Sequence, residues 1–222
     1  MTVNGVTVGK GTGSTNNNTV VGKVAFTNNT SGDNNVALGI SALRDNQTGS
    51  SNTAVGRYSG LLNVDGYENT YVGNNSGNKN VSGNYNTSVG VGSLLENTAD
   101  NNTAVGKSSM TNSVDANEST AVGASSLGNS NGANNTALGF KAGNDLTTGS
   151  NNLVLGHNAQ ASSYDVSNEV TIGNANVTTV RMGNGAIVYP MSSPILYTSV
   201  LSQTAQLPNG ATVSLPFTGT GW

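Results

Sequence analysis

The chain of 222 residues contains no cysteine, and only 9% of its residues are charged. The lack of cysteine excludes a disulfide framework and a cysteine-based zinc site. An average globular domain carries about 25% charged residues, and here the Lys and Arg residues, 8 in all, are scattered along the chain. Binding of nucleic acid through neutralised phosphates is therefore not expected.

Aromatic residues and long apolar runs are also scarce. Aromatic residues make up 5% of the chain, and no apolar run approaches the length of a membrane span. The first residues, Met1 to Gly5, lack the basic and apolar regions of a secretory signal, so no membrane insertion is expected. A disordered chain usually has a high net charge, whereas this one has a net charge of −3. We expect a thin, ordered and repetitive structure.

Glycine (30 residues) and asparagine dominate, and they occur in a repeat. The motif Asn-Asn-Thr-Ala-Val-Gly is intact at residues 101–106, and variants of it recur at intervals of 17 residues, shortened twice to 16. Its closing glycines are Gly22, Gly39, Gly56, Gly73, Gly90, Gly106, Gly123, Gly139, Gly156 and Gly173. A fixed period over most of a chain is the signature of a solenoid.

The predicted fold is therefore all-β: a parallel β-roll or β-solenoid of about ten 17-residue coils over residues 1–183. Residues 184–222 leave this register and contain all four prolines of the chain. Because proline is excluded from central strands, we expect this segment to be a short, β-rich, non-repeat tip or connector.

Each closing glycine follows a predicted strand whose side chains alternate between two faces. The residue before the glycine is always aliphatic, and the residue two positions earlier is Thr or aliphatic, so we expect this face to point inward. The core prediction comprises Val21, Leu38, Val55, Val72, Val89, Val105, Val122, Leu138, Leu155 and Ile172.

The residue between these two positions is mostly small and is expected on the outer face. A row of small residues lets another backbone approach closely, whereas the simpler alternative is a solvated face. The predicted subunit interface comprises Ala37, Ala54, Ser88, Ala104, Ala121 and Ala137. Each coil buries few large apolar groups, whereas ordering its backbone costs about 1–2 kcal/mol of conformational entropy per residue. A single chain would therefore be only marginally stable, and we expect an oligomer that associates along this row.

A second segment follows each glycine. It has Ser or Ala three residues on and then a bulky apolar residue or glycine, which predicts a second short strand with one inward side chain per coil. The residues at this fourth position are Phe26, Leu43, Gly60, Gly77, Leu94, Met110, Leu127 and Gly143. The two 16-residue coils are expected to lose their residue in the polar turn that comes next.

These repeats, such as residues 34–39 and 119–123, resemble the heads of trimeric autotransporter adhesins. The longer pattern over residues 134–151, with residues 3–9 and 168–174, is still more similar to bacteriophage tail fibres. The resemblance implies an intertwined or side-by-side homotrimer of left-handed β-rolls, with the Ala-bearing strands near the three-fold axis. It also implies an extracellular structural protein of a virion, which contacts other virion proteins and binds a host surface glycan or outer-membrane receptor.

Other functions are possible from the sequence. The head of a bacterial surface adhesin would place the chain on a cell surface but would also need a signal and an anchor. A polysaccharide-degrading tailspike would need two carboxylates across a cleft. The acidic pairs Asp65 with Glu68 and Asp115 with Glu118 instead occur in turns, and the one histidine, His157, follows a motif glycine.

We therefore expect no enzyme, no catalytic residues, no cofactor and no metal site. Exposed aromatic residues could stack on sugars, and Tyr189, Tyr197 and Trp222 at the tip are the predicted receptor contacts. Tyr58, Tyr67, Tyr85 and Tyr164 in the repeats are further candidates. Packing of one subunit against another is an equally weighted alternative for all of these side chains.

Overall fold

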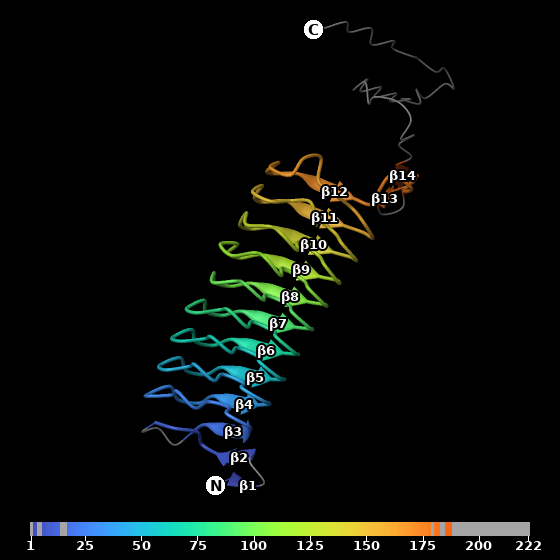
Figure 1. Ribbon diagram of the computed structural model, residues 1–222. Coiled ribbons are helices and arrows are strands. Elements are labelled where there is room, and N and C mark those ends of the chain that lie inside the picture. Colours follow the sequence, from blue (N-terminus) through green and yellow to red (C-terminus); the bar gives the residue numbers. More distant parts are fainter. Residues whose placement is uncertain (1, 4–5, 14–16, 179, 183–184, 188–222) are drawn as a thin grey trace, which may run out of the picture. The chain divides into compact units, whose positions relative to one another are not determined.

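The computed structural model describes residues 2–3, 6–13, 17–178, 180–182 and 185–187. The chain forms two units, Met1–Val177 and Thr178–Trp222. The first is a β-solenoid in which each coil contributes one short strand and successive coils stack on one another (Figure 1). Within the described residues, no helix is long and apolar enough to cross a membrane.

The solenoid sheet begins with an antiparallel cap and continues as a parallel ladder. Strands β1 (Thr2–Val3), β2 (Val6–Gly9) and β3 (Thr19–Gly22) pair antiparallel, so β2 covers the free edge of β3. From β3 onward every pairing is parallel. The following strands are β4 (Val36–Leu38), β5 (Thr53–Val55), β6 (Thr70–Val72), β7 (Thr87–Val89), β8 (Thr103–Val105), β9 (Thr120–Val122), β10 (Thr136–Leu138), β11 (Leu153–Leu155) and β12 (Val170–Ile172). The predicted fold class is confirmed.

Equivalent motif positions pair along the whole ladder, including the two short coils. Thr87 pairs with Thr103, and Thr120 pairs with Thr136, although each of these pairs is 16 residues apart in sequence. The missing residue therefore lies outside the strands, as expected. A slip inside a strand would turn every later side chain to the other face.

The second unit is described only in a short antiparallel pair. Strand β13 (Val180–Met182) pairs with β14 (Gly185–Ile187), with Val180 opposite Ile187. Most of the expected tip at residues 184–222, including Tyr189, Tyr197 and Trp222, lies outside the described residues.

The two faces of the strands are the reverse of the prediction. The central residue of each strand points into the solenoid: Ala37, Ala54, Ser88, Ala104, Ala121 and Ala137 are all 0% exposed. The expected interface row is thus buried inside its own chain. The expected core row faces outward: Leu138 is 53% exposed, Ile172 45%, Val21 39% and Val105 36%, and Leu38, Val55, Val72, Val89, Val122 and Leu155 are partly exposed.

The reason for this reversal lies across the coil. Large side chains from the second segment fill the interior: Phe26, Leu43, Leu94, Met110 and Leu127 are at most 1% exposed. The opposing strand position is mostly small, Ala or Ser, beside them, with buried Val20 and Val154 in strands β3 and β11. The two core clusters accordingly combine these bulky residues with the strand alanines.

The second segment is not a strand, contrary to expectation, although its inward bulky residue is confirmed. It consists of turns in which the second and fourth residues after the glycine are left-handed, for example Ser41 (φ 56°) and Leu43 (φ 48°). Such φ values are uncommon for residues other than glycine. Hydrogen bonds to the neighbouring coils offset the cost of these left-handed residues: Ser41 N donates to Lys23 O (3.0 Å), and Leu43 N donates to Ser59 O (3.0 Å).

Buried asparagines join the coils on the turn side. Asn52 Oδ1 accepts from Asn69 N (3.0 Å), and Asn52 Nδ2 donates to Gly66 O (2.8 Å). A second asparagine, Asn63, donates to the same carbonyl of Gly66 at 2.9 Å. Equivalent bonds recur in neighbouring coils, so the amides satisfy backbone groups that the turns leave inside the solenoid. This explains the high asparagine content.

The closing glycines form the corner where the chain leaves each strand. At Gly56 (φ 135°), an added Cβ would stand 2.5 Å from Gly73 O of the next coil. The corner requires both the unusual φ and the absence of a side chain, which explains why the motif always ends in glycine.

Candidate binding surfaces

The first candidate surface consists of the first and third residues of each strand from β3 to β12, which we term the outer strand face. Its Thr, Val, Leu and Ile side chains are partly or fully exposed, up to 65% at Val170. In a single chain this leaves a continuous row of aliphatic side chains beside a row rich in threonine. Contiguous exposed apolar surface of this kind is typical of an interaction site.

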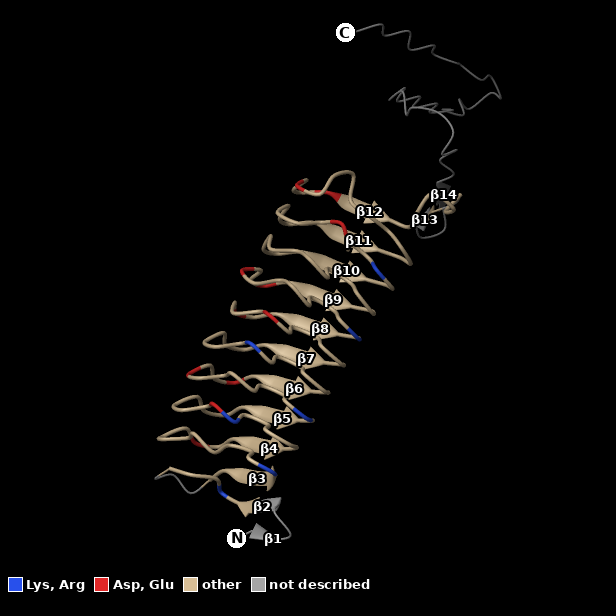
Figure 2. Cartoon of the chain, in the orientation of Figure 1, with Lys and Arg blue, Asp and Glu red and all other residues tan. Residues whose placement is uncertain are grey.

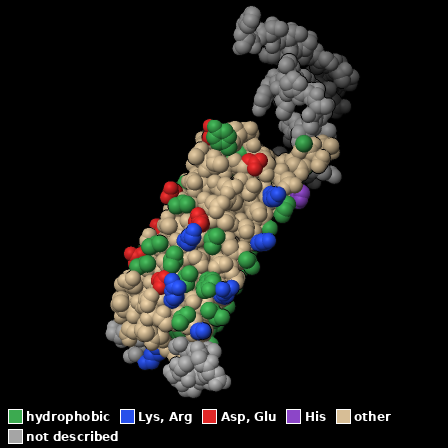
Figure 3. Space-filling view, in the orientation of Figure 1, with side chains coloured by type: hydrophobic (Ala, Val, Ile, Leu, Met, Phe, Trp, Pro, Cys, Tyr) green, Lys and Arg blue, Asp and Glu red, His purple; other side chains and the backbone are tan. Residues whose placement is uncertain are grey.

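Charged side chains lie mostly at two edges of the solenoid. At the basic edge, where the chain leaves the strands, are Lys23, Arg57, Lys107 and Lys141. Most acidic residues lie at the opposite, turn edge, where the chain enters the strands (Figure 2). Figure 3 shows apolar side chains interspersed with the basic ones along the basic edge.

Few of these charges are paired within the chain. Among the described residues the ion pairs are Arg44 with Asp45, at 2.6 Å, and Lys79 with Glu96. Two of the four basic-edge residues contact rings: the Arg57 guanidinium lies 4.2 Å from the centroid of Tyr58, and Lys141 Nζ lies 5.5 Å from that of Phe140. The basic edge thus keeps most of its charge available for another molecule.

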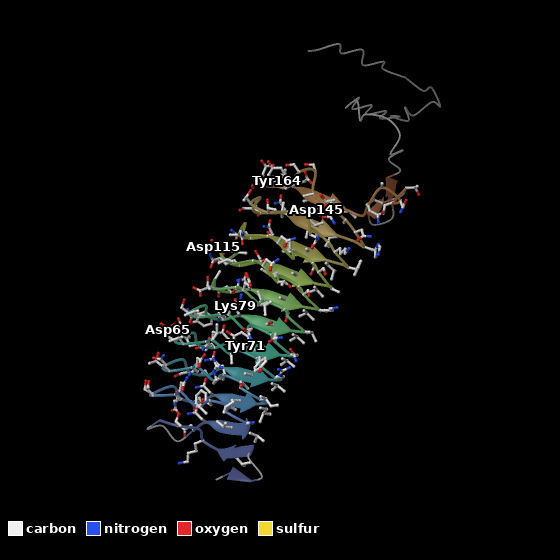
Figure 4. The ribbon with its side chains drawn as sticks, viewed as in Figure 1. Asp65, Tyr71, Lys79, Asp115, Asp145 and Tyr164 are labelled. Atoms are coloured by element: carbon white, nitrogen blue, oxygen red, sulfur yellow. The ribbon has the colours of Figure 1, made fainter. Side chains whose placement is uncertain are left out.

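The polar residues considered for catalysis are not brought together. His157 is exposed and stacks on Phe140, with ring centroids 5.4 Å apart and an interplanar angle of 19°. Asp65 and Asp115 extend from separate coils at the turn edge (Figure 4). In the described part of the chain, no three His, Cys, Asp or Glu side chains are grouped so as to hold a metal ion.

The tyrosines of the solenoid differ in their environments. Tyr164 is 63% exposed on its turn, whereas Tyr71 is 0% exposed and points inward from the centre of β6. Burial raises the pKa of Tyr71 above its ordinary value, and a hydrogen bond from Asn80 Nδ2 opposes this shift. Tyr71 is the only large aromatic side chain at a central strand position from β3 to β12.

Two tyrosines on adjacent coils form an exposed pair. Tyr67 is 40% exposed and Tyr85 47%, and their rings meet edge to face with centroids 5.1 Å apart. A hydrogen bond with Tyr67 raises the pKa of Tyr85 to about 12, with smaller contributions from desolvation and from the negative charges of Glu68 and Asp100.

A polar recess of about 370 Å³ lies next to this pair at the turn edge. Three successive coils line it with Ser82, Asn84, Thr98, Ala99, Asp100, Asp115 and Asn117. Sequence reasoning missed the recess, although the shortened coil from Gly90 to Gly106, which contributes its central residues, was visible as an interval of 16. A shorter turn between two longer ones leaves a depression.

Comparison with known proteins gave no relative. No protein-family model, no curated protein and no solved structure matches the chain. Any assignment of function therefore depends on the repeat and on these surfaces.

Proposed function

We propose that the chain is a structural fibre protein of a phage virion, a tail fibre that attaches the particle to its host and acts as a homotrimer. The observation that carries this proposal is the outer strand face, which runs along ten parallel strands and is not covered by any other described part of the chain. The proposed subunit interface is thus this face rather than the buried alanine row.

The geometry of the edges favours parallel association. When two copies stack face to face and run in the same direction, the basic edge of one copy lies beside the acidic edge of the other. An antiparallel pair would place like edges together, which is unfavourable for charges in contact. Parallel cyclic association suits a fibre, and the number of three copies comes from the resemblance to tail fibres and adhesin heads.

The proposal includes other virion proteins as partners and a host surface glycan or outer-membrane receptor as the target, with no catalytic activity. A surface adhesin head is the alternative in the same structural class. Release of oligosaccharides from host capsule or lipopolysaccharide would instead indicate a tailspike enzyme.

The test is the mass of the native protein in solution by light scattering, compared between two matched variants. Val105→Asp introduces a charge on the outer strand face, and Val114→Asp introduces one on a turn; the two wild-type side chains are 36% and 37% exposed. We expect a mass of three chains for the wild type and for Val114→Asp, and dissociation or misfolding for Val105→Asp. A folded wild-type monomer near 22.3 kDa would refute the trimer.

A further inference from the structure

The recess at the turn edge coincides with a coil that is one residue short. The coil from Gly90 to Gly106 lacks one residue, and because the register of β7 and β8 is intact, the loss falls on its turn. Thr98, Ala99 and Asp100 of this turn line the recess together with residues of the two neighbouring coils. The shortening also disturbs the asparagine network, since Asn97 Oδ1 and Asn102 Nδ2 are buried without a hydrogen-bond partner.

The recess is rigid and acidic. Asp100 Oδ1 accepts from Asn84 N (2.7 Å) and Asn84 Nδ2 (3.2 Å), and Asp100 N donates to Asn117 Oδ1 (2.9 Å). These bonds fix the Asp100 carboxylate, and among the described residues its second oxygen accepts no hydrogen bond. Asp115 adds a second, exposed carboxylate, and no basic side chain is among the lining residues.

The tyrosine pair adjoins the recess through Asn84. The Asn84 side-chain oxygen accepts a hydrogen bond from Tyr67 N (3.0 Å), and Tyr85 is the next residue along the chain. Tyr85 has a left-handed backbone with φ 58°, at a position that is Asn, Ser or Glu in every other coil from β4 to β12.

We propose that Tyr67, Tyr85 and the acidic recess bind an amino sugar unit of a host surface glycan. A sugar ring packs on an exposed tyrosine face, while the carboxylates of Asp100 and Asp115 accept hydrogen bonds from its ammonium and hydroxyl groups. Anionic sugars are disfavoured because the carboxylates would repel them. This inference rests on the proposed role in host attachment and requires the recess to stay open to solvent beside the neighbouring copy's basic edge. It places a receptor site on the side of the solenoid.

The probe is a fully deacetylated glucosamine tetramer, titrated into the intact assembled protein and followed by calorimetry and by ligand-observed NMR. The N-acetylated tetramer and N-acetylneuraminic acid serve as comparison ligands. We expect saturable binding of the glucosamine tetramer, weaker binding of its N-acetylated form, and none of the anionic sugar. Higher salt should weaken binding, because charge supplies part of the affinity.

Matched variants identify the site. Tyr85→Ala and Tyr67→Ala should each weaken binding about tenfold, as expected for loss of an aromatic contact near 1.4 kcal/mol. Asp100→Asn should remove the preference for the free amine, whereas Tyr164→Ala, which removes a more exposed tyrosine on a different coil, should have no effect. Circular dichroism and light scattering verify that each variant remains folded and assembled.

Absence of saturable binding would overturn the inference, and so would equal losses in Tyr85→Ala and Tyr164→Ala. These failures are distinguishable from failure of the proposed function, which is judged separately by the mass in solution and by adhesion of the wild-type protein to bacterial cells. Adhesion that Tyr85→Ala leaves unchanged would refute only the lateral site.

Discussion

The inward tyrosine of β6 permits a sharp test of how the interior is packed. Tyr71 occupies the space that a bulky second-segment residue fills in other coils, and the two second-segment positions nearest to it are Gly60 and Gly77. An added Cβ would lie 2.7 Å from a Tyr71 ring carbon at Gly60 and 2.1 Å from one at Gly77. The tyrosine and the two glycines are therefore complementary.

Tyr71→Ala should lower the free energy of unfolding by about 3–5 kcal/mol, the usual range for removing a buried aromatic ring. Gly77→Leu alone should also destabilise, by about 2 kcal/mol or more, because the new side chain collides with the ring. Combined, the two changes restore the pattern of the coils that carry Leu43 or Leu127 at this position. Those leucines have φ values of 48° and 46°, close to 58° at Gly77, so the backbone accommodates the substitution.

We therefore expect the effect of Gly77→Leu on the free energy of unfolding to have opposite signs in the two backgrounds: it should destabilise the wild type and stabilise Tyr71→Ala. The coupling free energy should be about 3 kcal/mol, at the upper end for residues in contact. Urea unfolding followed by circular dichroism at one fixed chain concentration gives all four values. Gly92→Leu serves as the control for backbone strain, because its nearest heavy atom is 3.9 Å from the added Cβ. Simple additivity of Tyr71→Ala and Gly77→Leu would refute the reasoning.

Three further predictions concern the repeat itself. Asn52→Ala removes the bonds to Asn69 and Gly66 of the next coil and leaves the buried Asn69 N unpaired, while Gly66 O keeps its bond from Asn63, so it should cost about 2–4 kcal/mol of unfolding free energy. Asn112→Ala, which breaks an exposed amide pair, should cost less than about 1 kcal/mol, and equal losses would contradict a structural role for the buried ladder. Gly56→Ala should destabilise the protein by at least about 2 kcal/mol, because the new Cβ would collide with the next coil. Gly92→Ala should cost only about 1 kcal/mol, which comes from its φ of 64°. Equal thermal unfolding temperatures for the two variants would disprove the steric explanation. The hydrogen bond from Arg44 lowers the pKa of Asp45, so the folded state loses this stabilisation as the pH falls below the ordinary carboxyl range. Asp45→Asn should therefore make the free energy of unfolding fall less steeply at acidic pH. An unchanged pH dependence would show that the ion pair contributes nothing.

The sequence predicted only some features of the candidate binding site. The positions of Tyr67 and Tyr85 and the shortened interval before Gly106 could be read directly. Their convergence could not, because it depends on the stacking of coils, which brings residues 16 to 18 positions apart in the sequence side by side. The hydrogen bonds that hold Asn84 between Tyr67 and Asp100 exist only in that stack.

The amino-acid sequence by itself determined the period, the strand positions, the recurring glycine that closes each motif and the bulky residue that most second segments carry. These features are local, since they follow from residue type and spacing. Only the tertiary structure decided which strand face is inside, because alternation defines two faces without saying which is buried. The choice depends on what lies across the coil: Leu43, Leu94 and Leu127 already fill the narrow interior, so the mostly small central residues turn inward and the aliphatic residue before each closing glycine remains outside.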